Sequence, residues 1–515
     1  MFDLSTTIAS LGTVLSIDVI GWVLLGVIVG CMFGAIPGLT ATTGIALFTP
    51  MTFGLDAILA IGFLLGLFCG GLWAGSIPAI LIKTPGAPGN AATTLDGYPL
   101  AQKGRSGEAM FYSVTCSWFG GTFSAFVLLF FAPIIAKAAL QFGPAEYCAV
   151  ALFGLSCIAA LSGENLTKGV ISGLIGMLIA TVGMDPVGGV MRFTFGNMNL
   201  IRGIKMVPAL VGLFALSEVL LKAESIGQES GVKLTTQVAI KISELKRYIG
   251  EMIRHWTVIL KSAIIGTIVG AIPGTGAATA SWISYNEAIR STKNPQEFGK
   301  GAVEGVMASE SANNAISGGA LIPLLTLGIP GDTATAVLLG ALTIQGITPG
   351  AKLVTENFGL IAEILWILII GNFFMLFVGL FGSKFFPKLL NVKQSILMPL
   401  ILVFCVAGSY ASGNNAFDCK VALILGIFGW FMMKFGFPVV PMVLGIVLGP
   451  ILEPNLRRAL IASKMDWSVF FTQPISCAFI VISILCVTLS IRNQRKGKKS
   501  AEQQIAEAEE KMESN

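Results

Sequence analysis

The sequence has few charged residues and a single histidine. Only 12% of its 515 residues are Asp, Glu, Lys or Arg, whereas 54% are hydrophobic. A soluble chain of this length needs far more charge to cover its surface. His255 is the one histidine, which excludes most histidine-containing metal sites and most histidine-based catalytic mechanisms. The composition therefore indicates a protein whose solvent is the lipid bilayer.

The sequence also lacks the motifs of common enzymes and of ATP-driven pumps. It contains no HExxH, no Gly-x-Ser-x-Gly and no P-loop. Its nine cysteines are scattered in apolar stretches without a CxxC or a Cys/His pair, so we interpret them as packing residues. The net charge of +5 gives no indication of nucleic-acid binding. We expect no enzymatic activity, no cofactor and no metal site; an intramembrane enzyme is a remote alternative.

Long apolar runs and 61 glycines are what the sequence has instead. Runs of about 18 or more apolar residues are long enough to cross a bilayer as helices, and small residues let such helices approach closely. We predict an all-α, multi-pass membrane protein of about twelve transmembrane helices. The runs are 19–36, 57–82, 109–135, 145–162, 168–184, 205–222, 257–272, 306–328, 333–350, 357–381, 396–411, 421–450 (broken by Gly436 and Pro438) and 468–491.

A long polar stretch divides the chain into two apolar halves. We predict a first transmembrane half at 1–222, a polar linker at 223–256, a second transmembrane half at 257–491 and a charged tail at 492–515. The linker and the tail are rich in Lys and Arg, which places both in the cytoplasm by the positive-inside rule. The N-terminal residues lack the basic segment of a signal peptide, so we expect a retained first span in a bacterial inner membrane.

Two Pro-Gly motifs occur once in each half, in the same order. Gly34–Gly38 and Gly270–Gly274 both read Gly-Ala-Ile-Pro-Gly at the end of an apolar run. Downstream, Ile77–Gly86 and Ile322–Gly331 both begin Ile-Pro and end Pro-Gly, with the same spacing between the two prolines. Small polar residues follow each motif. We therefore predict two internal repeats, in an inverted arrangement.

The Pro-Gly motifs are the expected binding region. Proline and glycine break helices, and a broken helix inside a membrane is tolerated where its free backbone groups meet protein, water or a ligand. Half-helix N-termini can receive carboxylates, and free carbonyls can hold a sodium ion. The alternative is that each motif is a loop whose Thr and Ser side chains cap helices. The expected substrate-binding residues are Pro37, Gly38, Thr40, Thr43, Lys83, Pro85, Gly86, Asn90, Thr93, Thr94, Gly274, Thr275, Thr279, Asn313, Asn314, Pro330, Gly331, Asp332, Thr333 and Thr335.

Three residues are candidates for the coupling ion: Glu310, Asn314 and Asp332. A carboxylate within an apolar run can carry a proton or bind a cation, but Glu310 and Asp332 could equally be helix caps or interface contacts. Lys83 could pair with an anionic substrate, or its side chain could extend to the membrane surface. We interpret the segment around Asp96 as a turn and cytoplasmic loop, and Glu164, Asp185 and Glu218 as solvated span ends.

These motifs, in this order, resemble the large subunit of the tripartite tricarboxylate transporters over nearly the whole chain. The most specific matches are Thr84–Gly86, Ala91–Pro99, Glu310–Asn314, Leu327–Gly331 and Gly346–Gly350. The chain departs from the family pattern at three positions: Lys83 stands where Asn is frequent, Asp332 where Ser is usual, and Gln345 where His is common.

The resemblance implies the large subunit of a three-part importer. A periplasmic binding protein would deliver a small carboxylate, a membrane subunit of about four helices would accompany this chain, and a Na+ or H+ gradient would drive import. Substrate would bind between the broken helices, with alternating access from the movement of one helix bundle against the other. A stand-alone carboxylate or ion symporter without a binding protein is the main alternative, and a channel is disfavoured.

Overall fold

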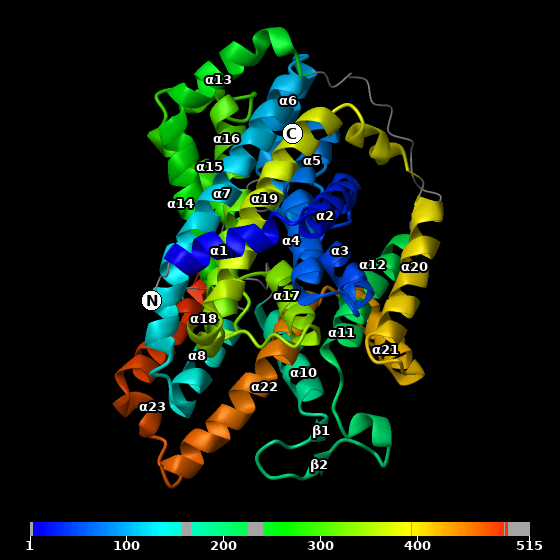
Figure 1. The fold of residues 1–515 in the computed structure, drawn as a ribbon, viewed down its shortest axis with the longest axis vertical. Helices are drawn as coiled ribbons and strands as arrows, with labels where there is room; N and C mark the ends of the chain where they lie inside the picture. The colour runs from blue at the N-terminus through cyan, green and yellow to red at the C-terminus, as the bar shows by residue number, and fades with distance from the viewer. Residues whose placement is uncertain (1–3, 157–165, 225–239, 393, 489, 493–515) are drawn as a thin grey trace, which may run out of the picture. The chain divides into compact units, whose positions relative to one another are not determined.

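The computed structural model describes residues 4–156, 166–224, 240–392, 394–488 and 490–492. Within these residues almost all regular structure is helical, as expected of backbone that must satisfy its hydrogen bonds inside a membrane. The exception is a short antiparallel pair in which β1 (Gly183–Met184) meets β2 (Met191–Arg192). The predicted all-α, multi-pass class is confirmed (Figure 1).

The chain folds into two compact units, each built from separated segments. Unit 1 comprises Met1–Gln141 and Lys205–Phe431, and unit 2 comprises Phe142–Ile204 and Met432–Asn515. The helices of unit 1 are α1 (Leu4–Val14), α2 (Ile17–Ala35), α3 (Ala41–Phe48), α4 (Ala57–Ala74), α5 (Ser76–Ile82), α6 (Thr93–Gln102), α7 (Ser106–Ala139), α11 (Met206–Leu210), α12 (Ser217–Ala223), α13 (Leu245–Arg254), α14 (Trp256–Ala271), α15 (Gly276–Ser291), α16 (Val303–Leu327), α17 (Thr333–Ile344), α18 (Ala351–Glu356), α19 (Phe358–Gly382), α20 (Gln394–Ala411) and α21 (Ala416–Lys434). Those of unit 2 are α8 (Pro144–Ser156), α10 (Leu166–Ala180), α22 (Val439–Ala462), α23 (Val469–Thr472) and the apolar helix Pro474–Arg492.

Fewer helices than predicted are both long and apolar enough to cross a membrane. The described residues hold eight such helices, or nine if the bent pair α13 and α14 is one span. The prediction of about twelve is therefore not confirmed. The predicted runs at 168–184, 333–350 and 396–411 correspond to shorter apolar helices. The predicted break at Gly436 and Pro438 does separate α21 from α22.

The first Pro-Gly motif ends a helix with the same backbone geometry in both halves. At the end of α2, Ile36 has φ −88° and ψ 118°; at the end of α14, Ile272 has φ −89° and ψ 114°. Gly38 and Gly274 then adopt φ values of 80° and 77°, in the left-handed region that glycine enters without strain. Short connections lead into α3 and α15, so each Pro-Gly motif is a real helix break.

The second motif also has matching geometry. Lys83 ends α5 and Gly328 ends α16, both in the left-handed region, with φ 59° and 73°. The next N–H groups reach back to equivalent prolines: Thr84 to the Pro78 carbonyl and Ile329 to the Pro323 carbonyl, each at 3.3 Å. The predicted duplication therefore extends to the backbone, while the inverted orientation of the repeats stays a prediction.

Within each copy the two motifs touch through glycine. A Cβ added at Gly86 would lie 2.5 Å from the Gly34 carbonyl oxygen, and one added at Gly331 would lie 2.4 Å from the Gly270 carbonyl oxygen. The copies also interlock, because α3 of the first packs against α17 of the second, and α15 of the second packs against the 3₁₀ turn η2 (Pro88–Asn90) of the first. Parts of both copies thus surround the centre of unit 1.

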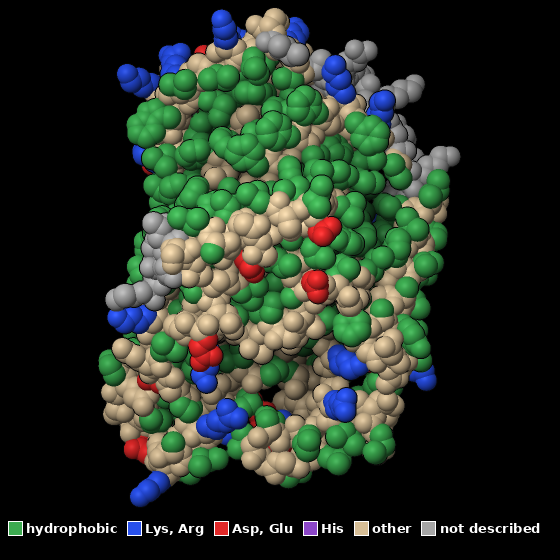
Figure 2. Space-filling model, in the orientation of Figure 1, with side chains coloured by type: hydrophobic (Ala, Val, Ile, Leu, Met, Phe, Trp, Pro, Cys, Tyr) green, Lys and Arg blue, Asp and Glu red, His purple; other side chains and the backbone are tan. Residues whose placement is uncertain are grey.

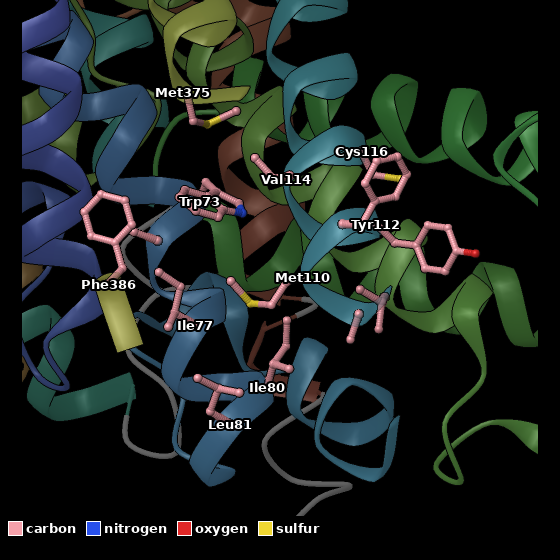
Figure 3. Packing of buried hydrophobic residues seen from close by; sticks show 14 of the residues in the cluster. Trp73, Ile77, Ile80, Leu81, Met110, Tyr112, Val114, Cys116, Met375 and Phe386 are labelled. Atoms are coloured by element: carbon pink, nitrogen blue, oxygen red, sulfur yellow. The ribbon is translucent and has the colours of Figure 1, made fainter. Parts of the chain in front are cut away.

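The core of unit 1 is packed around α4, α5, α7 and α16. Figure 3 shows Trp73, Ile77 and Ile80 of α4 and α5 beside Met110 and Val114 of α7. Small residues let α7 approach α16 closely: a Cβ at Gly120 would lie 2.0 Å from the Ser311 carbonyl oxygen. Figure 2 shows hydrophobic side chains over much of the visible surface, as expected of a bilayer-facing protein.

Unit 2 joins α8, α10 and α22. Gly176 of α10 and Gly445 of α22 sit at their crossing, where an added Cβ would lie 2.0 Å from the Met442 carbonyl oxygen or 2.2 Å from that of Gly173. The β1–β2 segment is tied to α22 by Arg192, 2.7 Å from Glu453, and by an ion pair between Asp185 and Arg457. Asp185 therefore has defined partners instead of the solvated contacts that we expected.

The two predicted halves do not coincide with the two compact units, since each unit takes segments from both halves. The division into repeat halves stays a prediction. In the predicted linker, residues 240–256 are described and include η5 (Ile242–Glu244) and α13. Most of the predicted tail, from 493 onward, and Glu164 lie outside the described residues.

Candidate functional site

Glu310 lies at the centre of unit 1, fully buried on α16. One carboxylate oxygen accepts hydrogen bonds from the Asn90 amide at 3.2 Å and the Thr93 hydroxyl at 2.5 Å. The other accepts a bond from the Ser117 hydroxyl at 3.1 Å. Asn90 and Thr93 follow the second Pro-Gly motif of the first copy, whereas Glu310 belongs to the second copy. The copies therefore meet at this carboxylate.

Further polar groups extend this cluster. The Thr93 hydroxyl also lies 2.9 Å from that of Ser309. The Asn90 and Asn313 amides both donate to the Leu72 carbonyl oxygen, at 3.3 Å and 3.0 Å. The amide oxygens of Asn90 and Asn313 are buried, with no hydrogen-bond partner among the described residues. Buried polar oxygens seldom stay unpaired, so these two can take part in binding a cation.

The charge of Glu310 is not balanced by a basic side chain. No Lys, Arg or His of the described residues forms an ion pair with it. The described part of the chain also contains no group of three or more His, Cys, Asp or Glu side chains suited to a metal ion. An isolated buried carboxylate is costly unless it binds a proton or another cation.

The first copy has leucine at the equivalent position. The numbering offset that relates Pro78 to Pro323 also relates Leu65 to Glu310 and Leu64 to Ser309. Leu64 and Leu65 line an apolar cavity with Ile61, Leu321, Leu325, Leu338, Ala341, Leu342, Gln345 and Ile364. The two copies therefore share a backbone arrangement but differ in chemistry, with a carboxylate in only one of them.

A second contact between the copies lies at the helix breaks. The Thr42 hydroxyl of α3 is 3.1 Å from the Thr333 hydroxyl at the start of α17. The Gly274 N–H donates to the Gly331 carbonyl oxygen at 2.8 Å, which joins the two motifs of the second copy. Neutral hydroxyls and half-helix starts thus gather where the copies interlock, with the Asp332 carboxylate at the start of α17.

Several predicted binding residues act as helix caps or bond to their own turn. The Thr40 hydroxyl accepts a bond from the Thr43 N–H, and Asp332 forms a capping box with Thr335. Thr94 donates to the Ala91 carbonyl oxygen at 2.6 Å, and Thr275 to that of Ile272 at 3.0 Å. The capping alternative therefore describes the local contacts of these residues.

Other predicted residues do not join the cluster around Glu310. Asn314, on the same helix, donates to the Met375 sulfur at 3.2 Å. Lys83 and Thr279 are exposed. The structure thus brings Asn90, Thr93, Asn313 and Glu310 together. Pro37, Gly38, Pro85, Gly86, Gly274, Pro330 and Gly331 form the helix breaks around them.

Sequence reasoning missed Ser117, Thr42 and Lys222. Ser117 belongs to a face of α7 with small residues three or four positions apart (Ser113, Ser117, Gly120, Gly121 and Ser124), a recognisable signal for close helix packing. The Lys222 ammonium donates to the Pro37 carbonyl oxygen at 3.3 Å and lies 3.6 Å from Glu218. In the sequence, Lys222 is only the last residue of the predicted first half.

Asp96 differs from its predicted role in a surface turn. It lies within α6 and is fully buried. One carboxylate oxygen accepts bonds from the Gly301 and Ala302 N–H groups, both at 2.8 Å, and the other accepts a bond from the Tyr285 hydroxyl at 2.7 Å. The carboxylate satisfies free N–H groups at the start of α16. Asp96 therefore fixes the first copy to the second.

Comparison with known proteins gives a family match over most of the chain. Residues 20–444 match the model of the tripartite tricarboxylate transporter TctA family. An uncharacterized 52.8 kDa protein in the TAR-I ttuC′ 3′ region of Agrobacterium vitis is 37% identical over 503 residues, which cover 96% of this chain and 98% of that protein. An uncharacterized protein in the TAR-II ttuC′ 3′ region of the same organism is 41% identical, over 45% of this chain and 97% of its own length.

Among solved structures, the crystal structure of a manganese transporter from Eremococcus coleocola aligns with 93% of this chain and 95% of its own. The identity is 13% and the TM-score is 0.13, so this likeness carries no argument about fold or function.

Proposed function

This chain belongs to the TctA family of tripartite tricarboxylate transporters, and on that basis we propose that it forms the translocation path of a gradient-driven importer of small carboxylates. The observation that carries the proposal is the buried Glu310 cluster, in which both copies contribute polar groups around one unbalanced carboxylate. Leu65 stands at the equivalent place in the first copy. The repeated backbone therefore does not by itself require a carboxylate at this position.

Glu310 is the proposed binding site of the coupling cation, either Na+ or H+. A carboxylate without a basic partner is most stable when it carries a cation, which links ion binding to the conformation of the site. The unpaired amide oxygens of Asn90 and Asn313 supply the neutral oxygens that Na+ would need beside it. Asp332, also a candidate from the sequence, forms a capping box and ranks below Glu310. Asn314 donates to the Met375 sulfur, but its amide oxygen is buried with no hydrogen-bond partner among the described residues, so it stays a candidate.

The carboxylate substrate is proposed to bind at the helix breaks, near Thr42, Thr333 and the half-helix starts of α3 and α17. The Thr42 and Thr333 hydroxyls can donate to carboxylate oxygens there without a permanent charge, whereas the Thr43 and Thr335 N–H groups already bond to Thr40 and Asp332. Lys222 supplies a cation beside Pro37 that is already paired with Glu218. Substrate binding would release Lys222 from Glu218, and movement of the helix breaks would follow.

The proposed partners are a periplasmic binding protein and a small membrane subunit of about four helices, in a bacterial inner membrane. The family name supports a three-part system. The alternative of a stand-alone symporter predicts transport by this chain without either partner.

The test is uptake of labelled dicarboxylates and tricarboxylates into proteoliposomes, with Na+ and H+ gradients imposed separately. Each partner is included or omitted in turn. Uptake that requires one gradient and both partners supports the proposal. Uptake by the chain alone supports the stand-alone symporter, and absence of uptake with all components and either gradient contradicts both.

A further inference from the structure

Helix α13 exposes apolar side chains beside a face that is already buried in protein. Tyr248 is 3% exposed and packs against Phe111, with ring centroids 5.3 Å apart. On the same face, the Met252 sulfur accepts a hydrogen bond from Thr115 at 3.2 Å. Contacts with α7 therefore account for the inner face of α13, and they leave its outer apolar residues unexplained.

The outer apolar residues of α13 form a short stripe. Ile249 and Ile253 are 45% and 67% exposed, and their spacing of four residues places them on one side of α13. Trp256, 58% exposed, begins α14 directly after the bend. On α14, the exposed Lys261 follows Trp256, and Ile264 and Ile268 after it are 40% and 58% exposed. Exposed apolar residues therefore occur on α13, at the bend and on the outer side of α14, an apolar helix of 16 residues.

The bend and the charges of α13 place it outside the hydrocarbon region. The axes of α13 and α14 differ by 66°. Four of the ten residues of α13 are charged, namely Lys246, Arg247, Glu251 and Arg254. That density of charge is too costly inside a bilayer, although the apolar stripe favours contact with it. A helix with both properties fits the membrane surface.

Basic side chains lie next to the stripe. Lys246 and Arg254 are exposed, whereas Arg247 is held by Glu108 and Glu244. At the bend, His255 lies 3.4 Å from Glu251 and 3.5 Å from Glu304, so its contacts are with acidic groups of the protein. In Figure 1 α13 lies at the upper end of unit 1, and Figure 2 shows Lys and Arg side chains at that end.

We propose that α13 is a surface helix that binds anionic phospholipid. Ile249, Ile253 and Trp256 contact the upper acyl chains, and Lys246 and Arg254 contact the phosphate groups. Lipid is the occupant because α14, which follows directly after the bend, is an apolar helix that also exposes isoleucines, and because a tryptophan beside basic residues is typical of a membrane interface. This site is independent of the transport proposal and would remain if the substrate were different.

The test uses fluorescence quenching in the full-length chain reconstituted with brominated lipids. The chain has eight tryptophans, so the Trp256 signal is taken as the difference between wild type and Trp256→Phe. We expect that signal to be quenched, and more strongly by brominated phosphatidylglycerol than by brominated phosphatidylcholine. The Lys246→Gln/Arg254→Gln variant should lose the preference for phosphatidylglycerol but keep the quenching.

The matched control is Lys293→Gln/Lys300→Gln, which removes the same charge from exposed positions outside α13 and should keep the preference. Absence of quenching by either lipid overturns the proposal, because a partner subunit, a second copy or water would then face the stripe. Equal quenching by both lipids in wild type overturns the anionic-lipid site. All four side chains replaced in the two double variants are exposed, so both variants should fold like the wild type. A monodisperse profile in size-exclusion chromatography checks this.

Discussion

At the scale of single residues, Glu310 and Leu65 occupy equivalent positions in the two copies but have different surroundings. Both lie in helices of similar packing, yet Leu65 lines an apolar cavity while Glu310 is bonded by three neutral donors. Burying a charged carboxylate without a basic partner costs roughly several kcal/mol, whereas a buried leucine contributes hydrophobic stabilisation. The difference is explained if Glu310 binds a cation during transport.

Lys83 is a residue whose backbone conformation is unfavourable. It adopts φ 59° at the end of α5, where the second copy has Gly328 at φ 73°. Replacing Lys83 by Gly should raise the free energy of unfolding by roughly 1 kcal/mol, because glycine enters this region without steric cost. Thermal unfolding in detergent measures the change. Asn, frequent here in the resembled family, also tolerates this conformation.

The Lys83→Gln variant is the control, since it removes the charge but keeps the strained backbone. A Gly variant no more stable than Gln would contradict the conformational account. If uptake is unchanged in both variants, Lys83 is not a partner of the substrate.

The sequence predicted the identity of several site residues but not the contacts between them. Asn90 and Thr93 could be singled out because they follow a Pro-Gly motif, and Glu310 because a carboxylate stands out in an apolar run. Their mutual contact could not, because Glu310 and Thr93 are joined only by the interlocking of the copies. Asp96 was misjudged because a Gly and a Pro follow it, whereas the structure continues α6 through both.

At the scale of helices, the breaks depend on glycines that permit backbone contact. Gly331→Ala should destabilise the protein by roughly 1–3 kcal/mol, because overpacking forces the backbone apart. The added Cβ would lie 2.4 Å from the Gly270 carbonyl oxygen and 2.6 Å from the Ala320 Cα. Thermal unfolding in detergent again measures the loss, and reduced uptake should accompany it.

Gly21→Ala in α2 is the matched control, because no heavy atom lies within 4 Å of the added Cβ. This variant should be neutral or slightly stabilised, by up to about 1 kcal/mol. Equal stability of the two variants would show that the contact between Gly331 and Gly270 is not needed for the helix break.

The helices were predictable where apolar runs are long and unbroken, as in α2, α7 and α19. The count was too high because short apolar helices such as α10 and α17 were taken as full spans. The predicted run at 306–328 corresponds to α16, which is 25 residues long but too polar to be counted among the eight candidate spans. Its polar face is satisfied by α6 and α7, a tertiary contact that hydropathy does not contain.

At the scale of the whole molecule, one fold is built from two copies with different chemistry. The repeated motifs predicted the duplication, but the two compact units were not predictable, because each combines segments far apart in the sequence. The copies share their helix breaks and differ at Glu310 and Leu65. This asymmetry favours a single coupling site within the Glu310 cluster.

The most direct test of this account compares gradient-driven accumulation with substrate exchange in proteoliposomes that contain all transport components. Glu310→Gln should abolish accumulation under either ion gradient and leave exchange of labelled for unlabelled carboxylate, because substrate contacts remain while the cation site is lost. Leu65→Met, a volume-conserving change at the equivalent position, should keep both activities. Accumulation by Glu310→Gln equal to that of the wild type would contradict the assignment of the coupling site.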